Sequence, residues 1–341
     1  MNNVRLIFRV FMVLIIWVSL ALANPVQYQK IGDFVLNSGE TITECVIGYR
    51  TYGKLNSAGT NIIVMPTWFG GTTRGLESMI GPGMLADSTK YYIITVDALG
   101  DGISSSPSTS KSQPKAEFPT FTIRDMVRSQ YQLLTRFLHI SHVYAVIGAS
   151  MGGMQAFQWS VSYPDFMAKV VPIVGSPALT SIDLLLWGAE LRAINEGLEC
   201  DASLESISQT VGAIQNYALW TPGYRVAHTP REKYPEYLQS IDKGFAGIFN
   251  IYNWRSQLKA MMSLDVTQDF NGSLEEAALS TKADFFIVVG LQDHMVNPTP
   301  AITFGKYVQA PVLKLDSDCG HLISGCERDT IAVTVNRFLS E

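Results

Sequence analysis

Residues 148–152 read Gly-Ala-Ser-Met-Gly, the spacing of a nucleophile elbow, in which a serine stands on a sharp turn between a strand and a helix. An apolar run of β-forming residues (143–147) precedes the turn, and a helix-like segment (151–162) follows it. Ser150 would stand at the helix N-terminus, where free backbone N–H groups favour developing negative charge. The alternative is a glycine-rich turn with an ordinary serine, but the flanking elements favour a nucleophile.

A serine nucleophile needs a base to take its proton, and the base needs an acid to orient it. In enzymes built on this elbow, the acid and then the histidine follow the serine along the chain. Two histidines qualify: His294 and His321 come after the elbow and outside the helical segment 178–272. His321 follows the last predicted strand and can reach back over the sheet, whereas His294 directly follows the candidate acid. We therefore predict that His321 is the base.

The predicted acid is Asp293, because it follows the apolar run 285–290 at the carboxyl end of a strand. Two carboxylates closer to His321, Asp316 and Asp318, remain alternatives. They lie just past another strand end, where shaping a turn is the more ordinary role.

An oxyanion formed at Ser150 needs two backbone N–H donors. Met151, directly after the nucleophile, is predicted to supply one. The loop 66–71 is predicted to supply the other through Trp68, with Phe69 as second choice, although its glycine pair could be only a turn. These residues predict an acyl-Ser150 intermediate, formed from an ester or thioester donor and released to water or a hydroxyl acceptor.

Six apolar runs are spaced like buried strands, with helical patterns between them. The runs are 62–67, 92–97, 143–147, 169–174, 284–290 and 312–315, and the helical patterns are 123–138, 151–162 and 331–339. Near-continuous apolar runs are typical of parallel strands covered on both faces. The alternation therefore predicts an α/β fold with a mostly parallel central sheet and helices on both faces.

Residues 178–272 break this alternation and have a mainly helical pattern, with Leu184, Trp187, Leu191 and Ile194 at helix-like spacing. We predict an inserted helical cap that covers the site. Most of its aromatic residues would form the core of the cap, and a few would line a substrate pocket.

The first residues have the features of an export signal. Arg5 and Arg9 precede an uncharged apolar run (10–22) that ends in an Ala-x-Ala cleavage site before Asn24. The run is shorter than the ~20 residues that span a bilayer, although an uncleaved anchor is the alternative. The prediction is a signal peptide (1–23), a mature domain (24–341) without stable membrane insertion, and a periplasmic or secreted location.

Charge and cysteine content indicate which kinds of partner and which covalent bonds the sequence allows. The formal net charge is −5, and no run of basic residues could bind a phosphate backbone. The sequence therefore disfavours nucleic acid as a partner. No zinc-binding motif is present, and the predicted chemistry needs no metal or cofactor. Cys319 and Cys326 flank His321. They can form a disulfide that pins its loop, or all four cysteines can be buried free thiols.

Four blocks of sequence are more distinctive than the elbow alone: 80–83, 118–119, 122–130 and 150–155. With them the chain, from about Gly48 onward, resembles the homoserine O-acetyltransferase family of α/β hydrolases. The resemblance implies a catalytic triad of Ser150, Asp293 and His321. It also implies a helical cap, often a homodimer through that cap, and ping-pong acyl transfer from acetyl-CoA or succinyl-CoA to a hydroxyl.

Three features depart from that family. Leu322 stands where homoserine-binding members usually carry aspartate, the cap block Phe249-Asn250-Ile251-Tyr252-Asn253 lacks the family's arginine, and export would separate the enzyme from CoA thioesters. We therefore expect an exported serine acyltransferase or esterase that hydrolyses esters or uses a non-CoA donor. Alternatives are a CoA-dependent homoserine-type acyltransferase and a non-catalytic protein that binds ligands in its cap pocket.

Overall fold

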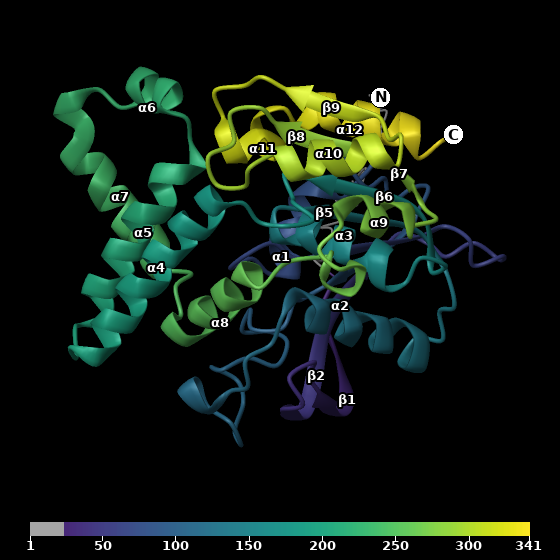
Figure 1. The fold of residues 1–341 in the computed structure, drawn as a ribbon, viewed down its shortest axis with the longest axis horizontal. Coiled ribbons are helices and arrows are strands. Elements are labelled where there is room, and N and C mark those ends of the chain that lie inside the picture. Colours follow the sequence, from purple (N-terminus) through teal and green to yellow (C-terminus); the bar gives the residue numbers. More distant parts are fainter. Residues whose placement is uncertain (1–23) are drawn as a thin grey trace, which may run out of the picture.

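A computed structural model describes residues 24–341, and the predicted signal peptide lies outside this range. The described chain forms one sheet with helices packed around it and a group of helices to one side (Figure 1). The strands are β1 (Gln27–Val35), β2 (Thr41–Tyr52), β3 (Ile62–Pro66), β4 (Tyr92–Val96), β5 (Val143–Ala149), β6 (Met167–Ile173), β7 (Asp284–Phe285), β8 (Ile287–Gly290) and β9 (Val312–Leu315).

The α-helices in the same range are α1 (Thr73–Leu76), α2 (Ile123–Gln132), α3 (Met151–Ser162), α4 (Ser181–Glu199), α5 (Leu204–Leu219), α6 (Pro222–His228), α7 (Tyr234–Ala246), α8 (Ile251–Met262), α9 (Leu274–Leu279), α10 (Thr299–Tyr307), α11 (Ile323–Cys326) and α12 (Arg328–Phe338). A π-helical turn (Leu133–Phe137) continues α2, so the predicted helix 123–138 is α-helical only in its first part. None of the described helices is long and apolar enough to cross a membrane.

The strand order is β1-β2-β4-β3-β5-β6-β8-β9, with the short β7 also paired to β6. All pairs are parallel except β1–β2 and β2–β4. The predicted α/β fold with a mostly parallel sheet is therefore confirmed. The apolar run 284–290 is divided into β7 and β8, and the strands β1 and β2 were not predicted. Most residues of β1 are exposed, so it lacks the continuous apolar run of the central strands.

Both faces of the sheet are covered, and β3 shows how. Its Ile62 and Val64 belong to the core cluster that includes buried residues of α2, α3 and α10. Ile63 and Met65 point the other way, into the cluster that includes α1 and α12. Successive side chains of a strand point to opposite faces, so a strand buried on both faces must be apolar throughout.

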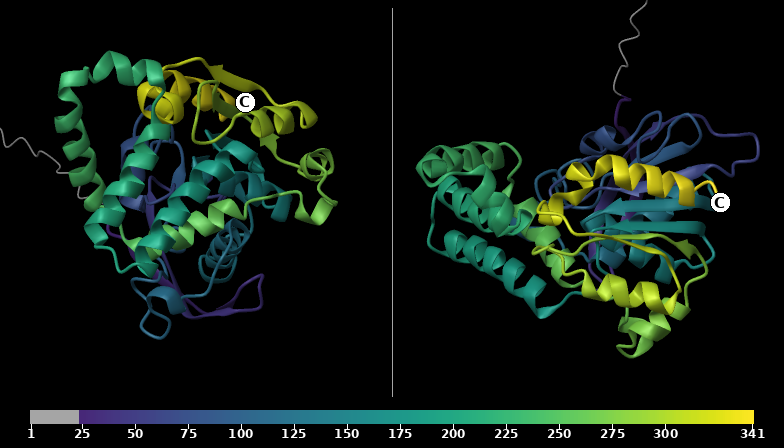
Figure 2. Two further views of the ribbon diagram at one scale, coloured as in Figure 1. Left: turned by 60° about the vertical axis from the view of Figure 1, so that its left-hand side comes forward. Right: turned by 90° about the horizontal axis from the view of Figure 1, so that it is seen from above.

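Helices α4–α8 lie between β6 and β7 in the sequence, within the segment 178–272 where we expected an inserted cap. Figure 2 shows α4–α7 standing to one side of the sheet. α8 packs against α4, and its Trp254 contacts Phe69 in the loop after β3. The insertion is thereby brought to the edge of the sheet where β3 and β5 end.

Candidate active site

Ser150 occupies a strained turn between β5 and α3, with φ 56° and ψ −122°. Left-handed φ values are uncommon for residues other than glycine and concentrate at functional sites. The turn leaves no room for neighbouring side chains. A Cβ at Gly148 would lie 2.0 Å from the carbonyl oxygen of Gly152, and a Cβ at Gly152 would lie 2.7 Å from that of Pro66. The two motif glycines are therefore needed to form this turn.

The three residues predicted as a triad meet in one hydrogen-bonded row. His321 Nε2 lies 2.8 Å from Ser150 Oγ, and His321 Nδ1 lies 2.7 Å from Asp293 Oδ2. The side chains of His321 and Asp293 are buried, whereas Ser150 is half-buried. A carboxylate only accepts, so Nδ1 carries the ring proton and Nε2 is left to accept the Ser150 hydroxyl proton.

Asp293 is held by the loop that follows β8. Its Oδ1 accepts hydrogen bonds from the backbone N–H groups of Met295 (2.8 Å) and Val296 (2.9 Å), which leaves Oδ2 for His321. These contacts fix the orientation of the carboxylate toward His321.

The other candidate acids and the other candidate base point away from this row. His294 is exposed to solvent, and the exposed Asp316 accepts a hydrogen bond from Gln292 Nε2 at 2.6 Å. Asp318 is also exposed, and only its backbone carbonyl is engaged, by Thr221. The structure therefore brings Asp293, and neither alternative carboxylate, to His321.

Three backbone N–H groups of the loop after β3 are already hydrogen bonded: Thr67 to Val96 O (3.1 Å), Gly70 to Gln257 Oε1 (3.0 Å) and Gly71 to Trp68 O (3.0 Å). Within residues 24–341, the N–H groups of Trp68 and Phe69 have no hydrogen-bond partner. The N–H of Met151, in the first turn of α3, has none either. The predicted donors are thus free to bind an oxyanion.

A cavity of about 530 Å³ opens onto Ser150 and His321 and extends between α5 and α7. Trp68, Phe69, Trp187, Phe245, Trp254 and Met261 supply much of its apolar wall. Gln215 and Asn216 add amide groups, and Leu322 lies beside the histidine. Among the described residues that line the cavity there is no aspartate, glutamate, lysine or arginine.

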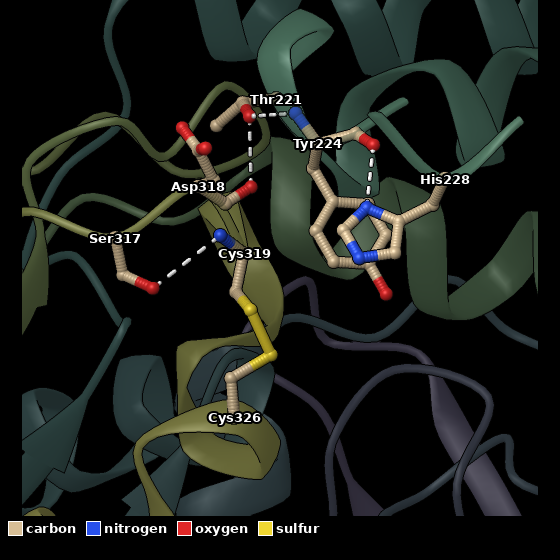
Figure 3. The surroundings of a disulfide bond; sticks show 7 residues. All are labelled: Thr221, Tyr224, His228, Ser317, Asp318, Cys319 and Cys326. Carbon is tan, nitrogen blue, oxygen red and sulfur yellow. Dashed lines mark hydrogen bonds between the residues drawn. A yellow bond between two sulfur atoms is a disulfide. The ribbon is translucent and has the colours of Figure 1, made fainter. Parts of the chain in front are cut away.

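A disulfide bond joins Cys319 and Cys326 and encloses the 3₁₀ turn Gly320–Leu322 that carries His321 (Figure 3). Beside the bridge, Thr221 Oγ1 of the helical insertion donates to the carbonyl oxygen of Asp318 at 2.8 Å (Figure 3). Cys326 is exposed, whereas Cys319 is buried. Of the two alternatives, the structure contains the bridge; Cys45 and Cys200 are free.

Two buried polar residues near the cavity were missed by the sequence analysis. Glu190 of α4 accepts a hydrogen bond from Trp254 Nε1 at 3.2 Å, and its burial raises the pKa of the carboxyl to about 8. Gln257 of α8 accepts a hydrogen bond from the N–H of Gly70.

A single polar residue in a helix belongs to no motif, so only its position on a buried helix face could have identified it from the sequence. No group of three or more potential metal-ligating side chains gathers in the part of the chain described.

A family model described as the alpha/beta hydrolase fold matches residues 62–325, which include the elbow and His321. This chain belongs to the α/β-hydrolase family. Its relatives include homoserine O-acetyltransferases and a homoserine O-succinyltransferase, as the sequence resemblance led us to expect. The proteins to which the chain is similar include esterases and acyltransferases of this fold.

Three similar proteins illustrate the range of relatives, from esterases to acyltransferases. The ethyl acetate hydrolase of Pseudomonas veronii is 35% identical over 202 residues, a match that spans only 58% of this chain and 58% of that relative. A probable acyltransferase of Methanothermobacter thermautotrophicus is 30% identical over 318 residues, covering 87% of this chain and 92% of the relative. The solved structure of the acetyl esterase MekB superimposes with a TM-score of 0.85 at 25% identity, covering 93% and 97% of the two chains.

Proposed function

We propose that this protein is a carboxylic ester hydrolase that acts on uncharged, apolar esters. The observation that carries this proposal is the cavity beside Ser150, whose described lining has no formally charged acidic or basic side chain. Homoserine has an ammonium and a carboxylate, and CoA has phosphates. Moving such charges into a mainly apolar cavity that offers no charged acidic or basic partner is costly. The name of the relative from Pseudomonas veronii, ethyl acetate hydrolase, supports the same substrate class.

In the proposed reaction, His321 takes the hydroxyl proton as Ser150 Oγ attacks the ester carbonyl. The negative charge that develops on the carbonyl oxygen is stabilised by the N–H of Met151 and by that of Trp68, or of Phe69 in its place. Protonated His321, oriented by Asp293, gives its proton to the leaving alcohol. Water then attacks the acyl-Ser150 ester with His321 again as base, which releases the acid and restores the enzyme.

We further propose that the enzyme acts outside the cytoplasm. The export signal predicted for residues 1–23 supports this location, as does the Cys319–Cys326 disulfide, because such bonds persist mainly in oxidising compartments. Cell fractionation with mass measurement of the mature N-terminus tests it. An uncleaved protein in the cytosol would contradict it and revive a CoA-dependent acyltransferase.

The activity is tested by incubating the purified protein with p-nitrophenyl acetate, alone and with increasing homoserine, and by identifying the products by mass spectrometry. We expect acetate as the acyl product at every homoserine concentration. The Ser150→Ala variant should lose roughly 10⁴-fold or more in kcat, because the residues of a triad act as a unit. Acetylhomoserine that accumulates at the expense of acetate would identify a transferase, and an active Ser150→Ala variant would rule out this nucleophile.

A further inference from the structure

Helix α8 of the insertion contacts the loop that presents the free N–H groups of Trp68 and Phe69. The side-chain amide of Gln257 lies between two backbone groups: its Oε1 accepts the N–H of Gly70 at 3.0 Å, and its Nε2 donates to Leu99 O at 3.1 Å. Gln257 is buried, with 1% of its surface exposed. Both ends of the amide are therefore engaged, which fixes its orientation and holds the Gly70 N–H away from the cavity.

Trp254, one turn before Gln257 on α8, packs against the same loop. Its ring centroid lies 4.1 Å from that of Phe69, and a Cβ at Gly70 would lie 2.6 Å from the indole. The indole N–H is in turn hydrogen bonded to the buried Glu190 of α4. Gly70 has φ +67°, so the loop turns sharply beneath the indole ring.

We propose that Gln257 is a positioning residue for the oxyanion site. By binding the Gly70 N–H, it selects the loop conformation in which the preceding N–H groups face Ser150, and Trp254, which packs on Phe69 and Gly70, supports the same conformation. The helical insertion then acts on the chemical step as well as on access to the cavity. This inference rests on the proposed ester hydrolase function.

The test compares Gln257→Met, which removes both hydrogen bonds at similar volume, with Gln257→Glu, which keeps an acceptor for Gly70. Arg255→Met is the matched control, since Arg255 also lies on α8 but bonds Asn195 of α4 and not the loop. The readouts are kcat and KM for p-nitrophenyl acetate, inhibition by a trifluoromethyl ketone that mimics the oxyanion, and the melting temperature.

For Gln257→Met we expect kcat to fall roughly 10- to 100-fold. This decrease is no larger than the one caused by removing a whole oxyanion donor, and KM should change by less than about threefold. Binding of the trifluoromethyl ketone should weaken in parallel. Gln257→Glu should retain more of kcat than Gln257→Met, and Arg255→Met should match the unmodified protein.

Two results would overturn the inference. One is a folded Gln257→Met variant with unchanged kcat and inhibitor binding. The other is a loss that Arg255→Met shares, or that follows the melting temperature alone, because the effect would then be structural. If the unmodified protein hydrolyses no ester, the proposed function fails instead, so the two failures are distinguishable.

Discussion

Among single residues, Glu190 is a carboxyl group in an almost fully buried environment. Burial raises the pKa of its carboxyl from 4.5 to about 8, although the Trp254 hydrogen bond acts in the opposite direction. In the unfolded chain the group ionises at its ordinary pKa, so between about pH 4.5 and 8 the unfolded state binds fewer protons than the folded state. The free energy of unfolding therefore falls as pH rises through this window and levels off above it.

We expect Glu190→Gln to remove this contribution, so that the melting temperature of the variant declines less between pH 5 and 8 than that of the unmodified protein. Differential scanning calorimetry across this range measures the difference. Glu196→Gln on the same helix, where the side chain is 68% exposed, is the control and should leave the pH dependence unchanged. Parallel curves for Glu190→Gln and the unmodified protein would mean that Glu190 ionises normally.

The hydrogen-bonded row of Ser150, His321 and Asp293 was predictable from sequence because each residue follows an apolar run at a position that topology brings to one edge of the sheet. Ser150 and His321 lie 171 positions apart, yet both come after strands of the same parallel sheet. Gln257 and Glu190 were not predictable, because their partners are a loop amide and an indole N–H that only tertiary packing brings near.

At the scale of elements, α7 forms one wall of the cavity opposite α5. Gly244 of α7 lines the cavity, and a Cβ there would meet no heavy atom within 4 Å. We expect Gly244→Leu to fill this part of the cavity without strain, and replacing a helical glycine should not lower the melting temperature. The ratio of kcat/KM for p-nitrophenyl hexanoate to that for p-nitrophenyl acetate should fall about tenfold, as expected when binding of a few methylenes is lost.

The control for that experiment is Gly247→Leu, directly after α7, which does not line the cavity and whose Cβ would approach only the Gly244 carbonyl oxygen, at 3.5 Å. It should leave the ratio unchanged. If the ratio of kcat/KM were also unchanged in Gly244→Leu, the acyl chain would not bind beside α7.

The central strands were predicted well because burial on both faces requires unbroken apolar runs. β1 was missed for the same physical reason, since most of its residues are exposed, and in β2 polar residues interrupt the apolar run. The helical insertion was expected from its pattern, but the placement of α8 on the loop after β3 depends on contacts such as Trp254 with Phe69. No periodicity along the chain encodes these contacts.

For the molecule as a whole, the Cys319–Cys326 disulfide closes a short loop around the histidine of the site. It spans seven positions and encloses the turn that bears His321. In the chain-entropy model, closing a loop of this size contributes about 2.5 kcal/mol to stability. We expect reduction to lower the melting temperature and to reduce kcat more than it changes KM, because the looser turn holds His321 less firmly.

Activity and thermal unfolding, measured with and without a phosphine reductant, test this expectation, with the thiols counted by mass spectrometry after alkylation. Cys326→Ser should reproduce the effect of the reductant and be insensitive to it. Cys200→Ser is the control, since that cysteine is free, and it should respond to reductant like the unmodified protein. A fully reduced protein with unchanged melting temperature and rate would show that the bridge does not support the site.

The aromatic wall of the cavity also has an optical consequence. Trp68, Trp187 and Trp254 all line it, so a molecule that enters the cavity changes the surroundings of these indole rings. Trp159 lies fully buried in the core and supplies a constant background. The emission of these tryptophans therefore reports when the cavity is occupied, and stopped-flow fluorescence can follow substrate entry and product departure without an added label.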